Sequence, residues 1–269
     1  MLLKRSDDCI LTEENVLKFR ANGHVFLEQL SNRAEIEEIR PIVSEIVASN
    51  NMKPSNREDE YSKAFLQVLN TRFESEQLLS FILKRRFASV AAKLLNARAV
   101  RIYYDCALFK VSGGGKTPLH IDPFVMDANK VVTMWMPLMD ITPSMGSLQF
   151  VSGSHLLGDI SLSPLQLIQK AVKEALPMVT YGPMKTGDCS FHSGWTIHQA
   201  PPNREEYTRE VLTVTYYDAS AILNDPADNP IRKHHLKDLF PGLKPGEQAA
   251  TPNNHLVFDE SDEMRCEEP

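Results

Sequence analysis

Two histidines, one aspartate and one arginine are the residues whose types and spacing are best suited to chemistry. His120 and Asp122 form a His-x-Asp pair, His198 follows much later, and Arg209 stands eleven residues after His198. Two imidazoles and one carboxylate are the ligands of the facial triad that holds non-haem Fe(II) in oxygenases. Alternate side chains of a β-strand point the same way, so His120 and Asp122 can bind one metal ion. We expect His198 to supply the third ligand.

Arg209 predicts a second role for the same site. A planar guanidinium binds a carboxylate through two parallel hydrogen bonds. Arg209 is therefore suited to hold the far carboxylate of a 2-oxo acid co-substrate. A His-x-Asp pair alone is weak evidence, but the pair, a distant histidine and a correctly spaced arginine together make a strong signal.

Composition and charge limit the kind of protein. The chain has 269 residues, of which 42% are hydrophobic and 24% charged, as is usual for a soluble globular protein. A net charge of -6 argues against nucleic acid or an anionic membrane as the main partner. The first residues show no signal peptide, and no apolar run is long enough to span a membrane. We expect a cytoplasmic protein, a monomer or weak homo-oligomer, with a small-molecule substrate.

The elements that must position these residues change character near residue 98. Helical patterns come first, with a kink or break expected at Pro41 and a helical stretch over residues 63–95. Short β-rich runs follow, which predicts an α+β, mainly β fold: a cupin-like jelly roll braced by N-terminal helices. We expect one domain made of four parts, namely a helical support (1–97), the jelly-roll core (98–220), a C-terminal wrap (221–258) and a frayed tail (259–269).

Three smaller features carry predictions of their own. Ser112 to Gly115 is glycine-rich, but no Gly-Lys-Ser or Gly-Lys-Thr at phosphate-loop spacing follows and no helix is expected to begin there, so a hinge or lid beside the His-x-Asp strand is favoured. Pro164 after Ser163 predicts the start of a helix. Asp105 and Lys110 are candidates for a structural ion pair.

Several stretches resemble the phytanoyl-CoA dioxygenase family of Fe(II)/2-oxoglutarate oxygenases. The similarity covers most of the chain, and its core motifs are specific. They are GGKTPLHID (114–122), VTMWMPL (132–138), MGSLQFVSGSH (145–155) and GDCSFHSGWTIHQAPPNR (187–204), followed by Arg209.

The resemblance implies a double-stranded β-helix and assigns roles to several residues. His120, Asp122 and His198 would bind Fe(2+) and carry catalysis, with 2-oxoglutarate and O2 as co-substrates. Arg209 would pair with 2-oxoglutarate, with Trp135 lining its pocket. Thr133 and Lys110 are further candidates for co-substrate binding. The sequence departs from the family at Pro123-Phe124 and at Ala200. These departures concern the identity of the substrate and the geometry of co-substrate binding, and not the triad.

The other histidines are compared with this motif as possible metal ligands. His198 is favoured over His192 as the third ligand, because the family motif puts the ligand just before x-x-Pro-Pro-Asn. His192 then becomes a pocket or structural histidine. We expect a structural hydrogen bond for His155 and a solvated pair for His234 and His235.

The implied activity is hydroxylation of an unactivated C–H bond of a small organic substrate, with release of succinate and CO2. The alternatives are a cupin-like metalloenzyme of another reaction type and a non-catalytic binding protein on the same fold. The substrate is not evident in the sequence. The segments expected to set specificity are 50–62, 112–116, 123–130, 158–180 and 224–255.

Overall fold

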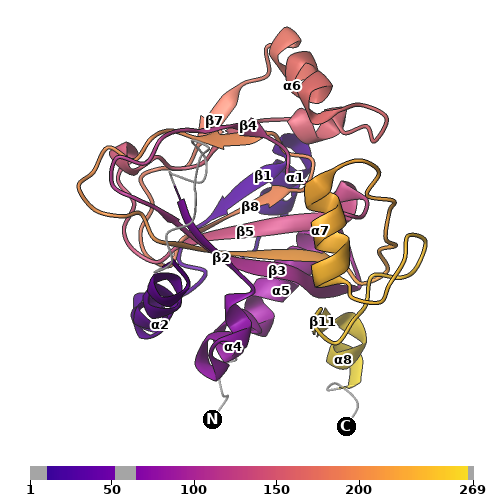
Figure 1. The fold of residues 1–269 in the computed structure, drawn as a ribbon, viewed down its shortest axis with the longest axis horizontal. Helices are drawn as coiled ribbons and strands as arrows, with labels where there is room; N and C mark the ends of the chain where they lie inside the picture. The colour runs from indigo at the N-terminus through magenta and orange to yellow at the C-terminus, as the bar shows by residue number, and fades with distance from the viewer. Residues whose placement is uncertain (1–10, 52–64, 266–269) are drawn as a thin grey trace.

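Two antiparallel β-sheets face each other, with helices on the outer side of the larger one (Figure 1). The structure, a computed structural model, describes residues 11–51 and 65–265. The large sheet has the strand order β1-β8-β5-β10-β3-β11, with β2 paired to β3, and the small sheet has the order β4-β9-β6-β7. This is the predicted α+β, mainly β jelly roll with helices bracing it.

The strands are short except for β3 and β10. They are β1 (His24–Leu27), β2 (Phe65–Leu69), β3 (Ala99–Lys110), β4 (Thr117–His120), β5 (Val131–Pro137), β6 (Gln149–Val151), β7 (Met178–Thr180), β8 (Cys189–Ser193), β9 (His198–Ala200), β10 (Val211–Asp218) and β11 (Leu256–Asp259).

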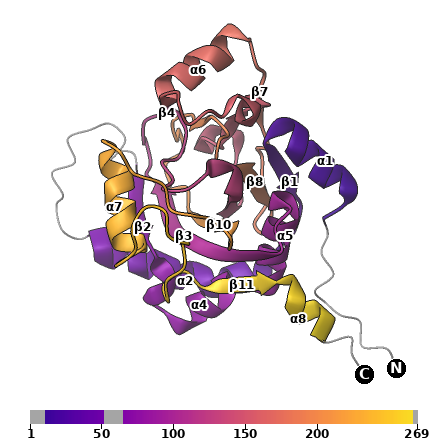
Figure 2. The same cartoon turned by 90° about the vertical axis from the view of Figure 1, so that its right-hand side faces the viewer.

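The α-helices fall mostly before β3. They are α1 (Glu13–Asn22), α2 (Arg33–Asn51), α4 (Glu76–Ile82), α5 (Arg85–Leu95), α6 (Pro164–Lys173), α7 (Pro230–Leu239) and α8 (Glu260–Arg265). Short 3₁₀ turns are η1 (Thr71–Phe73), η2 (Ala128–Lys130), η3 (Pro143–Met145) and η4 (Ser154–Leu157). In both views α2 and α4 lie beneath the large sheet, whereas α6 lies beyond the small one (Figure 2).

The large sheet separates two environments because its side chains alternate between its faces. On β3, Ala107 and Phe109 join the core that packs against α2, α4 and α5. Cys106 and Leu108, one residue out of phase, face the space between the sheets and line a pocket there. The register of β10 with β3 and β5 keeps the same alternation across the sheet. The helix side therefore supplies a rigid core, and the other face is left for a site.

The helical expectation for residues 63–95 is wrong at its start. Phe65 to Leu69 form β2, which pairs antiparallel with the Cys106–Lys110 end of β3. Only Phe65 is buried on this strand, which lies off the main path of the sheet. A short apolar run cannot be assigned by periodicity alone, and here pairing with a long strand decides its structure.

Pro41 does not end the second helix, because α2 continues through it to Asn51. Pro41 lies on the exposed side of α2. Water can therefore satisfy the carbonyl that a proline leaves without its helical partner. Of the segment 50–62, which is expected to contribute to specificity, residues 52–62 lie outside the described ranges.

The C-terminal segments hold more structure than the sequence indicated. The wrap contains the ten-residue helix α7, which begins with the cap Asn229 and with Pro230 in its first turn. The wrap ends with β11, which pairs with β3 and buries Phe258 in the main core. The last residue of β11, Asp259, and the helix α8 fall within the tail. The expectation of a frayed tail is therefore wrong up to Arg265, and 266–269 lie outside the described ranges. Among the described helices, none is both long and apolar enough to cross a membrane.

Candidate active site

His120, Asp122 and His198 come together between the two sheets. The strands β4 and β9 pair so that His120 lies opposite His198, with ring centroids 4.1 Å apart. Asp122 follows β4 in an extended segment, and its Oδ1 lies 3.8 Å from Nε2 of His120. One ligand atom from each of the three residues lies within 4.8 Å of the others. Such a cluster can hold one metal ion.

Backbone hydrogen bonds fix the orientation of both imidazoles. Nδ1 of His120 lies 2.9 Å from the carbonyl oxygen of Pro118, and Nδ1 of His198 lies 3.0 Å from that of Thr196. A carbonyl only accepts, so each Nδ1 carries the proton and each Nε2 keeps its lone pair. A ring held in this way by its other nitrogen is the usual state of a metal-bound histidine. The chemistry of the donor set therefore fits a divalent transition metal.

The electrostatics of the cluster favour the same protonation state. Burial lowers the pKa of His198, and the neighbouring His120 lowers it further, so the His198 ring is neutral near pH 7. Burial acts in the opposite direction on Asp122, but the adjacent His192, His198 and His120 outweigh it and hold the pKa of the Asp122 carboxyl below its ordinary value. A carboxylate and neutral imidazoles are the forms that bind metal.

His192 is a fourth histidine of this cluster. It lies on β8, its Nε2 is 3.8 Å from Oδ2 of Asp122, and its ring centroid is 4.7 Å from that of His198. Both of its ring nitrogens are buried without a hydrogen-bond partner within the described chain. The cluster of three potential ligands contains His198 and not His192.

An inner pocket of about 90 Å³ connects this cluster with Arg209. One water needs about 10–15 Å³ of such space, so a small polar molecule has room there. His120, Asp122 and His198 line it together with Arg209 and with Trp135. The two sets of residues predicted from the sequence therefore share one enclosed space.

Arg209 is fully buried just before β10 and is held from several sides. Its Nη1 donates to the carbonyl oxygen of Gly146, and its guanidinium carbon lies 5.3 Å from the Trp135 ring. Gly146 has φ of +75°, and a Cβ there would come within 2.2 Å of the carbonyl oxygen of Pro201. Only glycine therefore lets this turn bring its carbonyl to Arg209.

Thr133 and Lys110 occupy different positions around this pocket. Thr133 lines it and shares a hydrogen bond of 3.0 Å with Thr215. Lys110 is not among the lining residues; its Nζ donates to the carbonyl oxygen of Pro201 at 2.5 Å. Burial lowers the pKa of Lys110 to about 7, with a further contribution from the charge of Arg209. Lys110 thus neighbours Arg209, with which it forms a backbone bridge, as an amine that is only partly protonated near pH 7.

The prediction of an ion pair between Asp105 and Lys110 is wrong. Asp105 pairs instead with Arg72, whose Nη1 lies 2.5 Å from its Oδ1. Positions 105 and 110 are an odd number of residues apart on one strand, so their side chains leave opposite faces of the sheet.

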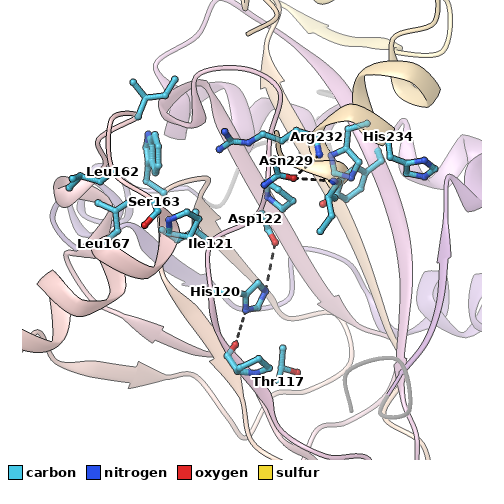
Figure 3. A pocket seen from close by; sticks show the side chains of 18 of the residues that line it. Thr117, His120, Ile121, Asp122, Leu162, Ser163, Leu167, Asn229, Arg232 and His234 are labelled. Carbon is cyan, nitrogen blue, oxygen red and sulfur yellow. Dashed lines mark hydrogen bonds and ion pairs between the residues drawn. The ribbon is translucent and has the colours of Figure 1, made fainter. Parts of the chain in front are cut away.

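A second, larger cavity of about 960 Å³ opens onto the cluster of His120, Asp122 and His198, called the metal cluster below (Figure 3). His120 and Asp122 line both this outer cavity and the inner pocket. Two of its other walls come from residues 160–167 and from α7, within two of the segments expected to set specificity, and β2 and β3 contribute Gln67, Leu69 and Tyr104. Sequence reasoning missed the individual residues here. The chief ones are Leu162, Leu167, Trp195, Asn229 and Arg232.

The remaining histidines divide between structure and surface. His155 makes the expected structural contact, with its Nε2 3.0 Å from the carbonyl oxygen of Arg20. His234 is exposed, whereas His235 is buried and lies 3.2 Å from the Tyr103 hydroxyl. The expectation of a solvated pair is therefore wrong for His235, because α7 turns that side toward a cluster of aromatic residues.

A jelly roll that brings two imidazoles and a carboxylate together between its sheets has the architecture of the non-haem iron oxygenases. Comparison with known families agrees. Residues 19–211 match the family described as phytanoyl-CoA dioxygenase (PhyH), and the chain belongs to this family. It is accordingly a non-haem iron oxygenase that depends on 2-oxoglutarate.

Individual relatives are distant but extend over most of the chain. A methylphosphonate hydroxylase of Gimesia maris is 24% identical over 238 residues, which are 85% of this chain and 86% of that protein. The epimerase SnoN from nogalamycin biosynthesis has a TM-score of 0.78 at 23% identity, covering 91% of this chain and 97% of its own. EctD from S. alaskensis, solved with 2-oxoglutarate and 5-hydroxyectoine, has a TM-score of 0.66 at 17% identity, covering 82% and 81%. These structural likenesses show the fold.

Proposed function

We propose that this protein hydroxylates an unactivated C–H bond of a small organic substrate, using 2-oxoglutarate and O2 and releasing succinate and CO2. The observation that carries this proposal is the inner pocket, which is lined by His120, Asp122 and His198 and also by Arg209. A dicarboxylic oxo acid needs a metal at one end and a cation at the other. The activity named for the Gimesia maris relative is also a hydroxylation, which supports the same reaction type.

In this proposal His120, Asp122 and His198 hold Fe(II) through one ligand atom each. When bound, iron and 2-oxoglutarate supply the oxidative chemistry, in which decarboxylation of the oxo acid is coupled to oxidation of the substrate. EctD from S. alaskensis has been solved with bound Fe, which supports iron for this fold. The carbonyl oxygens of Pro118 and Thr196 fix the two rings so that their Nε2 lone pairs serve the metal.

Arg209 would bind the far carboxylate of 2-oxoglutarate. It is fully buried, so its attraction for an anion is weakly screened by water. Trp135 and Thr133 would form the walls around the oxo acid, and Lys110, when protonated, would add positive potential beside Arg209. Substrate would enter through the outer cavity and meet the metal at His120 and Asp122.

The experiment that tests this function is an anaerobic titration of the purified apoprotein with Fe(II) and then with 2-oxoglutarate. We expect the weak visible charge-transfer band of the iron chelate in the wild type and its loss in Asp122→Ala. The matched control is Asp228→Ala, which removes a fully exposed carboxylate whose ion-pair partner among the described residues is Lys233.

Each outcome of the titration has a distinct meaning. A band in the wild type and in Asp228→Ala, but not in Asp122→Ala, supports the metal and the co-substrate together. Iron binding without a band favours a metalloenzyme of another reaction type. No retention of iron favours a non-catalytic protein on the same fold.

A further inference from the structure

The outer cavity is much larger than the co-substrate requires. Its volume of about 960 Å³ compares with about 90 Å³ for the inner pocket. Ligand pockets for drug-sized molecules span roughly 300–1,000 Å³. The cavity therefore has room for a substrate well beyond the size of 2-oxoglutarate.

The walls of this cavity are mainly apolar. Ile121, Leu162, Leu167 and Trp195 line it beside the metal cluster. Ile160 and Ile231 also line it, yet they are 69% and 53% exposed, from opposite walls. Exposed large apolar side chains at the rim of a cavity indicate a binding surface. The body of the substrate is therefore apolar.

Arg232 places a positive charge in these walls. It extends from α7 toward the wall that carries Leu162 (Figure 3). Its Nε is buried without a hydrogen-bond partner, and its guanidinium makes no ion pair with any described residue. The neighbouring basic residues of α7 have acidic partners, Asp228 for Lys233 and Asp238 for His234.

A partly buried arginine without an anion is costly, and a carboxylate or phosphate matches its planar fork. The other permanently charged group lining the cavity is Asp122, whose charge is assigned to the metal. Arg232 is thus the charged side chain of this cavity that is available to pair with a substrate.

Resting on the proposed function, we infer that the prime substrate is an amphipathic organic anion. Its acidic group, a carboxylate or a phosphate-type group, pairs with Arg232. Its apolar body lies along Leu162, Leu167 and Trp195 and brings a C–H bond to the metal cluster.

The test measures binding to the metal-free protein, so it does not depend on turnover. The chain has two tryptophans, and Trp195 lines the outer cavity whereas Trp135 lines the inner pocket. In a Trp135→Phe background the fluorescence of Trp195 alone reports on the outer cavity. The probes are decanoate, decyl phosphate and uncharged 1-decanol.

We expect decanoate or decyl phosphate to bind at least tenfold more tightly than 1-decanol. Arg232→Gln should weaken the preferred anion about 10- to 100-fold, as expected when a hydrogen bond to a charged group is lost. The same change should leave 1-decanol within about twofold. Lys233→Gln, one residue further along α7 and paired outside the cavity, is the matched control and should change neither.

Four outcomes decide the inference. The anion that loses more affinity in Arg232→Gln identifies the acidic group as carboxylate or phosphate. Equal binding of the anions and 1-decanol, or an unchanged affinity in Arg232→Gln, overturns the inference. Displacement of the anion by 2-oxoglutarate also overturns it, because the acid would then lie in the inner pocket. A missing iron chelate band with an intact Arg232 effect rejects the proposed hydroxylation but retains the anion site.

Discussion

Asp105 and Asp122 lie on opposite sides of the large sheet and have opposite environments. Asp105 faces the helices, where it accepts hydrogen bonds from Thr71 and from Arg72, with the shortest at 2.5 Å. Asp122 faces the space between the sheets, where its nearest partners are imidazole nitrogens of His120 and His192 at 3.8 Å. The carboxylate of Asp105 is saturated by its own chain, whereas that of Asp122 could hold a metal ion.

The same contrast extends to the other polar groups of the two faces. On the helix side, Glu35 binds Arg86, Lys84 and Ser31. On the cavity side, both ring nitrogens of His192 and Nε1 of Trp135 are buried without a hydrogen-bond partner in the described chain. An unpaired buried polar group costs about 1–3 kcal/mol. The helix side also has such atoms, at Nε of Arg72 and Arg86, but both guanidiniums are otherwise paired with carboxylates. Neither ring nitrogen of His192 has a partner in the described chain, so its ring is the polar group most open to a ligand.

The largest expected effect tests the two aspartates against each other. Asp105→Ala leaves Arg72 as an unpaired buried charge, and we expect a loss of about 3–5 kcal/mol in the free energy of unfolding. Asp122→Ala should cost the metal-free protein less, about 1–2 kcal/mol, because only the neighbouring imidazoles favour its charged form. Urea unfolding of the two variants measures both values. Equal destabilisation would mean that Asp122 is a structural residue.

Arg209 provides the next test, because it is a buried cation assigned to a ligand. Arg209→Lys keeps the charge but removes the planar fork, and we expect the Kd for 2-oxoglutarate to rise about 10- to 100-fold. Calorimetric titration of the anaerobic Fe(II) protein measures this change. Arg204→Lys alters an exposed arginine five residues earlier and should leave the Kd unchanged. An unaltered Kd in Arg209→Lys would place the co-substrate elsewhere.

His192 tests the comparison of the two faces further, because its ring makes no hydrogen bond in the described chain that a substitution would remove. His192→Phe should leave the unfolding free energy unchanged or slightly higher, while Fe(II) affinity falls about tenfold because Asp122 loses its neighbour. His155→Phe is the matched control, because it removes a hydrogen bond to the carbonyl oxygen of Arg20 and should cost about 1 kcal/mol. Metal titration and thermal unfolding measure the two effects. A large stability loss in His192→Phe would contradict its assignment to the cavity face.

The sequence was sufficient to predict the fold class and to find the residues of the inner pocket. The chemistry of the predicted site follows from side-chain type and spacing, which are visible without the tertiary structure. This holds for His120, Asp122, His198 and Arg209. The short β-rich runs after residue 98 likewise predicted the sheets. Their joint placement around one pocket agrees with that reasoning.

Features that depend on tertiary pairing could not be predicted in the same way. Phe65 to Leu69 form a strand because β3 offers an edge, which no local pattern records. Arg232 lies in a cavity wall because the tertiary fold places α7 beside His120 and Asp122. Asn229-Pro230 was the available signal for that helix, since asparagine caps helices and proline favours their first turn.

Glu35 yields the smallest expected effect and a dependence on pH. Partial burial raises its pKa, but the hydrogen bonds from Arg86, Lys84 and Ser31 outweigh this and lower the pKa from 4.5 to about 2. A carboxylate whose pKa is lower in the folded state stabilises the fold above its unfolded pKa, and this contribution disappears as the pH falls.

Glu35→Gln should therefore lower the unfolding free energy by on the order of 1 kcal/mol at pH 7, after allowance for solvent screening. The difference from the wild type should shrink as the pH falls from about 4.5 toward 2, where Glu35 itself becomes protonated. Urea unfolding at several pH values measures this, with Glu37→Gln, exposed on the same helix, as the control. A difference that stayed constant over this range would show that the Glu35 charge does not connect α2 to α5. The helix face would then owe its stability to apolar packing alone.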